Sequence, residues 1–146
     1  MIILRKLIKF PVPPNYLVML YCQIIRSILE FNSSVWFSSI TDEEADDLER
    51  VQKNAWRVIL KDRYEDYETA LNCLNLQNLR ERRKRLALKF GKKCLQIEEM
   101  KGLLQESKKT EYNLRNQEQF DVKFAAGQRL YKSAIPTIQR LMNKSV

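Results

Sequence analysis

Apolar residues recur at helical spacing between residues 15 and 31 and mark the first predicted element. The polar positions there, Gln23, Arg26, Ser27 and Glu30, fall on one side at 3.6 residues per turn. The other positions are apolar: Leu17, Leu20, Tyr21, Ile24, Ile25, Ile28 and Leu29. This pattern predicts a helix that is buried over most of its girth. Three prolines separate it from a short amphipathic lead, MIILRKLIKF.

A second helix is predicted from the acidic run TDEE to about Lys61. Thr41 can accept a hydrogen bond from the amide of Glu44, and Glu44 can reach back, which is a capping box. The apolar face is predicted at Ala45, Leu48, Val51, Ala55, Val58 and Ile59. The opposite face carries four basic residues, Arg50, Lys53, Arg57 and Lys61. Trp56 lies beside the apolar face, which favours core packing over base stacking.

The remaining pattern predicts three further helices and completes the fold class. A short helix is expected at residues 67–74, and Asn78 with Glu81 repeats the capping geometry before a helix to about Glu98. Its apolar face is predicted at Leu79, Leu86, Phe90, Cys94 and Ile97. Residues 101–130 are expected to be mostly irregular, and a last helix runs from near Pro136 to about Asn143.

The expected architecture is an all-α fold of four or five helices, a small helical bundle with an irregular C-terminal segment. The first, second and fourth helices are expected to bury their apolar faces together. The predicted division is a lead at residues 1–14, a helical domain at 15–100, and a tail at 101–146 with a short C-terminal helix.

Composition excludes several classes of protein and site. Apolar residues make up 45% of the 146 positions, yet no uninterrupted apolar run is long enough to predict a membrane span. Histidine is absent and the three cysteines are scattered, which removes the usual zinc sites and the Ser/His and Cys/His nucleophile pairs. The run EADD (residues 44–47) suits the start of a helix better than a polymerase metal site. We therefore expect no catalytic residue, metal or cofactor, and an intracellular location in cytoplasm or nucleus.

Positive charge is concentrated in the stretch LRERRKRLALKFGKKC. Residues 79–97 hold eight basic residues and one acid, a net charge of +7, in a chain of net charge +8. On a helical wheel Arg83 points into the apolar face, where a carboxylate of a neighbouring helix is its expected partner. The outward side carries Arg82, Arg85, Lys89, Lys92 and Lys93, flanked by Arg80 and Lys84.

Three interpretations of this basic run remain open on composition: contact with phosphates, a solvated helix face without a ligand, and a nuclear import signal. The firm helical pattern disfavours an import signal, which needs an extended segment. The candidate nucleic-acid-binding residues are Arg50, Lys53, Arg57, Lys61, Arg82, Arg85, Lys89, Lys92 and Lys93.

Four segments in order resemble one family. They are IIRSILEFNSSVWFSSIT, DLERVQKNAWRVIL, YEDYETALNCLNLQNLRERRKRLALKFGKKCL and QRLYKSAIPTIQRLMN. Together they resemble the C-terminal region, from the thumb onward, of non-LTR (LINE, jockey-like) retrotransposon reverse transcriptases, which are RNA-directed DNA polymerases. The lead MIILRKLIKF is similar to the helix that leaves the palm of such enzymes. At residues 126–129 the run AGQR departs from the family pattern, which puts any contact made there in doubt.

The resemblance implies a non-catalytic module that grips the template–primer. The catalytic aspartates of the family lie in the palm, upstream of the matching region, so no enzyme activity is expected of this fragment. The thumb helices of the family match residues 50–61 and 79–93 here. The expected partner is an RNA/DNA duplex or hybrid bound without sequence preference, and the missing palm and fingers are a second candidate partner.

Two alternatives stand beside this expectation: a helical protein-interaction module, and a decayed retroelement fragment without function. The chain itself is expected to be a truncated reading frame or a piece of a larger product.

Overall fold

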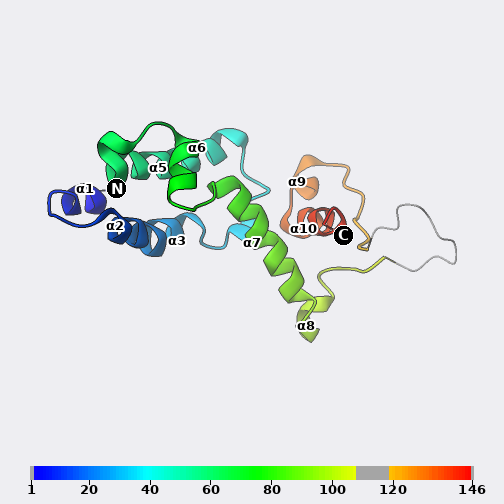
Figure 1. Cartoon of the computed structure of the whole chain (residues 1–146). Coiled ribbons are helices and arrows are strands. Elements are labelled where there is room, and N and C mark those ends of the chain that lie inside the picture. Colours follow the sequence, from blue (N-terminus) through cyan, green and yellow to red (C-terminus); the bar gives the residue numbers. More distant parts are fainter. Residues whose placement is uncertain (1, 108–118, 146) are drawn as a thin grey trace. The chain divides into compact units, whose positions relative to one another are not determined.

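The computed structural model describes residues 2–107 and 119–145 (Figure 1). Within these ranges the elements are helical and no strand is formed, so the predicted all-α class is confirmed. An isolated antiparallel bridge joins Glu106 and Phe120. In chain order the elements are α1 (Ile2–Leu7), α2 (Pro14–Leu20), a π turn (Tyr21–Ile25), α3 (Arg26–Leu29), α4 (Ser33–Trp36), α5 (Asp42–Leu60), a 3-10 turn (Lys61–Arg63), α6 (Tyr67–Cys73), α7 (Leu79–Cys94), α8 (Glu98–Lys101), α9 (Gln128–Tyr131) and α10 (Ala134–Asn143).

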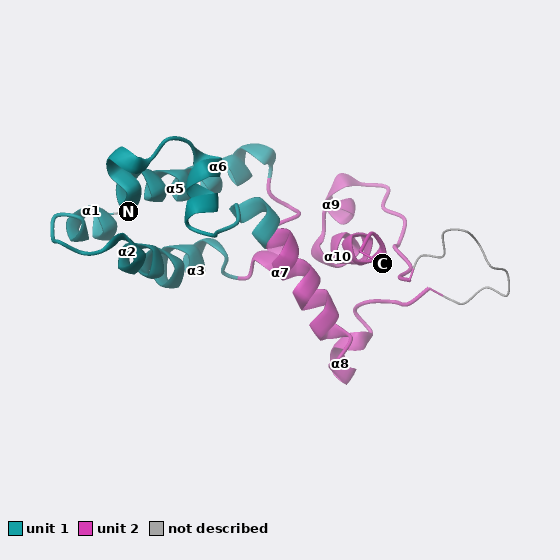
Figure 2. Ribbon diagram, in the orientation of Figure 1, with its two compact units in different colours: residues 1–31, 41–82 teal, residues 32–40, 83–146 magenta. Residues whose placement is uncertain are grey.

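The chain divides into two compact units (Figure 2). Unit 1 comprises Met1–Phe31 and Thr41–Arg82, and unit 2 comprises Asn32–Ile40 and Arg83–Val146. The first turn of α7 therefore belongs to unit 1, and the rest of the helix belongs to unit 2. This division differs from the predicted lead, domain and tail, because the lead helix and the last helix each pack into a core.

The core of unit 1 forms where α1, α2 and α6 pack against α5. Trp56 and Tyr21 are fully buried, with ring centroids 4.5 Å apart in an edge-to-face arrangement. The predicted core position of Trp56 is thus confirmed. Leu4 of α1 is also fully buried, so the amphipathic lead is part of this core rather than a separate segment.

The first predicted helix is present as α2, the π turn and α3, but the prediction that most of its girth is buried is wrong. Leu17 and Tyr21 are buried, whereas Ile28 and Phe31 are each 71% exposed. Tyr16, Met19 and Ile24 are exposed as well. An apolar wheel pattern cannot say how much of a helix will be covered, and within unit 1 the covered residues of α2 pack on α5.

The predicted capping box at the start of α5 is confirmed. The Glu44 amide donates to Thr41 Oγ1 at 3.2 Å, and the Thr41 amide donates to Glu44 Oε2 at 2.8 Å. The helix ends at Leu60, one residue before the predicted end, where Lys61 adopts a φ of 49°. Ala45, Ala55 and Ile59 of the predicted apolar face are buried, and Gln52 joins them.

The core of unit 2 lies between α7 and α10. Its buried members are Ala87, Cys94, Leu104, Phe120, Ile138 and Met142. The expectation that the fourth helix buries its apolar face with the first and second helices is therefore wrong for this part of α7. Gly91 allows the close approach, because a Cβ there would lie 2.7 Å from Ile138 Cγ2 and from Met142 Sδ. Helix α7 ends at Cys94, four residues before the predicted end.

The described part of residues 101–130 is mostly irregular, as predicted, but it is tied to the last helix. The Asn143 amide group pairs with the backbone of Phe120 through two hydrogen bonds of 3.0 Å. Helix α10 starts two residues before the predicted Pro136 and ends at Asn143 as predicted. Residues 108–118 of the stretch expected to be irregular lie outside the described residues. Among the helices that the structure describes, none is long and apolar enough to cross a membrane.

Candidate nucleic-acid interface

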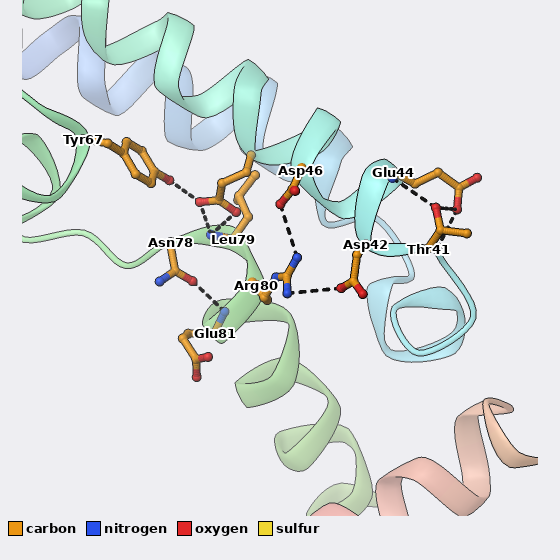
Figure 3. A network of polar contacts seen from close by, with 10 residues as sticks. Thr41, Asp42, Glu44, Asp46, Tyr67, Asn78, Leu79, Arg80 and Glu81 are labelled. Atoms are coloured by element: carbon orange, nitrogen blue, oxygen red, sulfur yellow. Dashed lines mark hydrogen bonds and ion pairs between the residues drawn. The ribbon is translucent and has the colours of Figure 1, made fainter.

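The start of α7 is held by acids on α5 (Figure 3). Both carboxylate oxygens of Glu49 accept from the Leu79 amide at 3.1 Å. Arg80 lies 3.3 Å from both Asp42 and Asp46. Asp42 and Asp46 were predicted to act only at the start of their own helix, and their contact with Arg80 was missed because the partner is more than thirty residues away.

A chain of polar side chains continues from Glu49 into unit 1. The Tyr67 hydroxyl donates to Glu49, and Gln52 Nε2 donates to the Tyr67 hydroxyl at 2.8 Å. Gln52 Oε1 accepts from the Tyr21 hydroxyl at 2.8 Å. Burial raises the pKa of both Tyr21 and Tyr67 far above the usual range for a tyrosine. Each hydroxyl donates within this chain of contacts, and the chain ends at Glu49, which accepts from the first amide of α7.

Arg82 does not face outward as predicted. It pairs with Glu30, and the two side chains are only 22% and 11% exposed. Removal of either group would leave a charge in a poorly hydrated place. Arg82 is therefore part of the packing of unit 1, and the prediction that it contacts phosphates is wrong for a side chain that is already paired and largely buried.

Arg83 is buried as predicted, with 2% of its surface exposed. Its guanidinium carbon lies 5.9 Å from the ring centroid of Trp36, within unit 2. A cation over an indole ring is a favourable arrangement, most so when it is shielded from water. The carboxylate partner expected from the sequence stays a prediction.

The basic stripe of α5 is largely engaged within unit 1. Arg50 pairs with Asp47 at 2.7 Å. Lys53 Nζ lies 5.1 Å from the ring centroid of Tyr67, and Arg57 Cζ lies 5.5 Å from that of Tyr64. Lys61, the last of the four, is exposed in the turn after the helix. The stripe exists, but three of its four cations already have a contact in the chain.

The later part of α7 carries the cations that unit 2 leaves available. Arg85, Lys89, Lys92 and Lys93 are all exposed, and none has an ion pair, hydrogen bond or ring contact with a described residue. At 100° per residue they lie on the side of the helix away from the buried residues Ala87, Gly91 and Cys94. From the first to the last they span about 12 Å along the axis. We call these four residues the α7 basic face.

Sequence reasoning missed the basic residues around α10. Arg140 lies with its guanidinium carbon 4.0 Å from the ring centroid of Tyr131. The available signal was the charge of residues 121–146, where five basic residues face one acid. Without the fold, that charge could not be assigned to a place.

No group of three or more metal-ligating side chains occurs among the described residues. Comparisons with family models, with curated proteins and with solved structures found no match to this chain.

Proposed function

We propose that this chain is a non-catalytic, nucleic-acid-binding module that grips a template–primer duplex or RNA/DNA hybrid, in the manner of a reverse transcriptase thumb. The observation that carries the proposal is the α7 basic face: four exposed cations on one helix face without a partner in the described chain. The segment order noted in the sequence supports the same function.

Such a face suits phosphates rather than bases. Lysine and arginine side chains on a convex helix neutralise backbone charge and release condensed counterions, which makes binding salt-dependent and weakly selective for sequence. A helix segment of about 12 Å covers about three to four base-pair steps along a duplex axis, which is enough for several phosphates. The module would position nucleic acid and perform no chemistry of its own.

The other predicted binding residues rank below this face. Lys61 is exposed and Arg50 is paired only with an exposed acid, so both can add to binding. Lys53 and Arg57 already lie over the rings of Tyr67 and Tyr64. A phosphate would have to bind beside these rings or replace them, so both residues rank last.

The test is binding of the full chain to a hybrid duplex across a salt titration. We expect log K to fall linearly with log salt, with a slope of about −3 to −4 for four phosphate contacts. The variant Arg85→Gln, Lys89→Gln, Lys92→Gln should reduce the slope by about 2.7.

A matched control is Lys6→Gln, Lys9→Gln, Lys123→Gln, which removes the same net charge at other exposed positions. The control should bind almost as the unmodified chain does. Absence of binding at about 50 mM salt would contradict the proposed function. Equal loss in both triple variants would show that net charge, not the α7 basic face, determines binding.

A second candidate function, protein docking, is favoured by exposed apolar side chains along α2, the π turn, α3 and the turn after α3. Exposed apolar side chains grouped on one segment are a feature of interaction sites. Here the group comprises Tyr16, Met19, Ile24, Ile28 and Phe31. The resemblance suggests the palm and fingers of a polymerase as the partner.

The test of this candidate is co-purification with a separately expressed fingers–palm segment of that polymerase family. Ile28→Glu should abolish the association, and Ile3→Glu on α1 should not. Equal association of both variants would exclude this surface as the docking site.

A further inference from the structure

Unit 2 contains a cavity of about 320 Å³ bounded by α7, α9, α10 and the residues that directly follow α4. This volume lies at the small end of the range for ligand pockets, about 300–1,000 Å³. Its lining residues are Phe37, Ser38, Lys84, Tyr131, Lys132, Thr137, Arg140, Leu141 and Lys144. All of them belong to unit 2.

The lining of this cavity is cationic. Four of its side chains, Lys84, Lys132, Arg140 and Lys144, are basic, and no carboxylate is among the lining residues. Two other cavities of the described chain differ in this respect, since one is lined by Glu106 and Asp121 and the other by Asp62. Basic side chains gathered around one concave site that has no acid in its lining favour an anion over a cation.

The walls of the cavity are held in place by local contacts. The hydroxyls of Ser38 and Ser39 donate to the Lys132 carbonyl at 2.7 and 3.2 Å. Arg140 donates to the Tyr131 carbonyl and, at 2.9 Å, to Thr137 Oγ1. The segment between α9 and α10 is thereby tied both to the end of α4 and to α10. A cavity with fixed walls can bind a ligand without a large ordering cost.

Aromatic surface lies beside the cations. Phe37 and Tyr131 both line the cavity, and Tyr131 is 50% exposed with its ring next to the Arg140 guanidinium. Aromatic rings and arginine planes beside lysines are the groups that bind a base and its phosphate together, as in proteins that bind single strands.

We propose that this cavity binds one nucleoside phosphate unit, with the phosphate among its basic side chains and the base against Tyr131. The unit can come from a free nucleotide or from an unpaired nucleotide of a strand. The cavity is distinct from the α7 basic face, so the inference does not depend on the function proposed above.

The experiment measures binding of three probes to the full chain: inorganic phosphate, adenosine monophosphate, and a single-stranded pentanucleotide. Calorimetry gives affinity and stoichiometry, and amide chemical shifts locate the site. We expect adenosine monophosphate to bind in a 1:1 ratio and more tightly than phosphate, with shifts at residues 131–144. The pentanucleotide and the mononucleotide are compared in the variant Arg85→Gln, Lys89→Gln, Lys92→Gln, so that the α7 basic face does not contribute. Tighter binding of the pentanucleotide than of the mononucleotide there would assign the source as a strand, and the reverse would assign a free nucleotide.

Two pocket variants separate the roles of charge and ring. Lys132→Gln with Lys144→Gln should weaken nucleotide binding at least about tenfold. Tyr131→Ala should weaken nucleotide binding about tenfold and leave phosphate binding unchanged.

The α7 triple variant serves as the control, because it should bind the mononucleotide normally while its binding to duplex is weakened. Unchanged nucleotide binding in the lysine pair variant overturns the proposal. So does nucleotide binding no tighter than that of phosphate, or shifts confined to the α7 basic face. If the lysine pair variant loses the fold by circular dichroism, Tyr131→Phe and Tyr131→Ala decide instead, and equal affinities for the nucleotide overturn the proposal.

Discussion

The basic faces of α5 and of the later part of α7 look alike in sequence and differ in use. Each has four Lys or Arg residues at helical spacing. On α5 an aspartate and two tyrosines of the same unit occupy three of them. On α7 the residues Arg85, Lys89, Lys92 and Lys93 have no such contact within the described chain.

The difference comes from what surrounds each helix. In unit 1, two tyrosines lie beside α5: Tyr67 at the start of α6 and Tyr64 just before it. The cations of α5 therefore contact aromatic rings. In unit 2, Ala87 and Gly91 of α7 are buried toward α10 and Arg83 is buried beside Trp36 of α4, which leaves the opposite side of the helix exposed. A basic stripe therefore indicates a binding surface only if its cations have no contacts with other residues of the folded chain.

The largest effect is expected where an α7 cation is used for folding. Arg82→Ala would leave Glu30 largely buried without its partner, and we expect a loss of about 2–3 kcal/mol in the free energy of unfolding. Lys89→Ala should change it by less than about 0.5 kcal/mol. Urea denaturation followed by circular dichroism measures both. The double variant Glu30→Met, Arg82→Met should recover most of the loss, because it leaves no unpaired charge. Failure to recover would mean that the ion pair itself, and not the avoidance of an unpaired Glu30, stabilises unit 1.

The buried side of α7 is tested at Gly91. Gly91→Val would press against Ile138 and Met142, with an expected cost of about 1–3 kcal/mol in the free energy of unfolding. Gly102→Val is the matched control, since a Cβ at that position meets nothing within 4 Å. Thermal unfolding of the two variants compares them, and equal stabilities would contradict the close contact of α7 with α10.

Single neutralisations in the binding assay compare the two faces directly. Lys89→Gln should weaken binding to a hybrid duplex about three- to fivefold at low salt, because one phosphate contact is lost. Arg50→Gln should weaken it less than about twofold, because Arg50 already pairs with Asp47. Fluorescence anisotropy at several salt concentrations measures both affinities. A larger effect at Arg50 would reverse the ranking of the two faces.

The smallest effect concerns the acid that caps α5. Hydrogen bonds from the Thr41 backbone and side chain hold the pKa of Glu44 below its usual value. A depressed pKa means that the stabilising contribution is complete above the unfolded value and is lost as the pH falls through the folded value. Glu44→Gln keeps an acceptor but cannot titrate. The stability difference between this variant and the unmodified chain should therefore shrink below about pH 4.5, as urea denaturation at several pH values would show. A stability difference that does not change with pH would show that the charge of the Glu44 carboxylate does not contribute to the capping box.

Several features could be predicted because they depend on near neighbours in the chain. The capping box of Thr41 and Glu44 involves residues three apart, as does the contact of Asn78 with the Glu81 amide. The burial of Arg83 and Trp56 followed from their position on an apolar face. Helix starts and helix faces are local properties, since they follow from caps and from the 3.6-residue period.

The places where prediction failed involve distant residues. Glu30 and Arg82 are 52 positions apart, and Arg80 and Asp46 are 34 apart. The wheel placed Arg82 outward correctly for an isolated helix, but it carried no information on the acid that lies beside it. The exposed side of the α2–α3 segment was missed for the same reason.

The sequence by itself determined the helical class, the helix starts and the positive charge along α7, because these depend on composition and short-range spacing. Only the tertiary structure decided which cations are available to a ligand. Ion pairs, ring contacts and burial against α5 or α10 depend on which distant segments meet. The same contacts gathered Lys84, Lys132, Arg140 and Lys144 around one cavity, although up to 60 positions of sequence separate them.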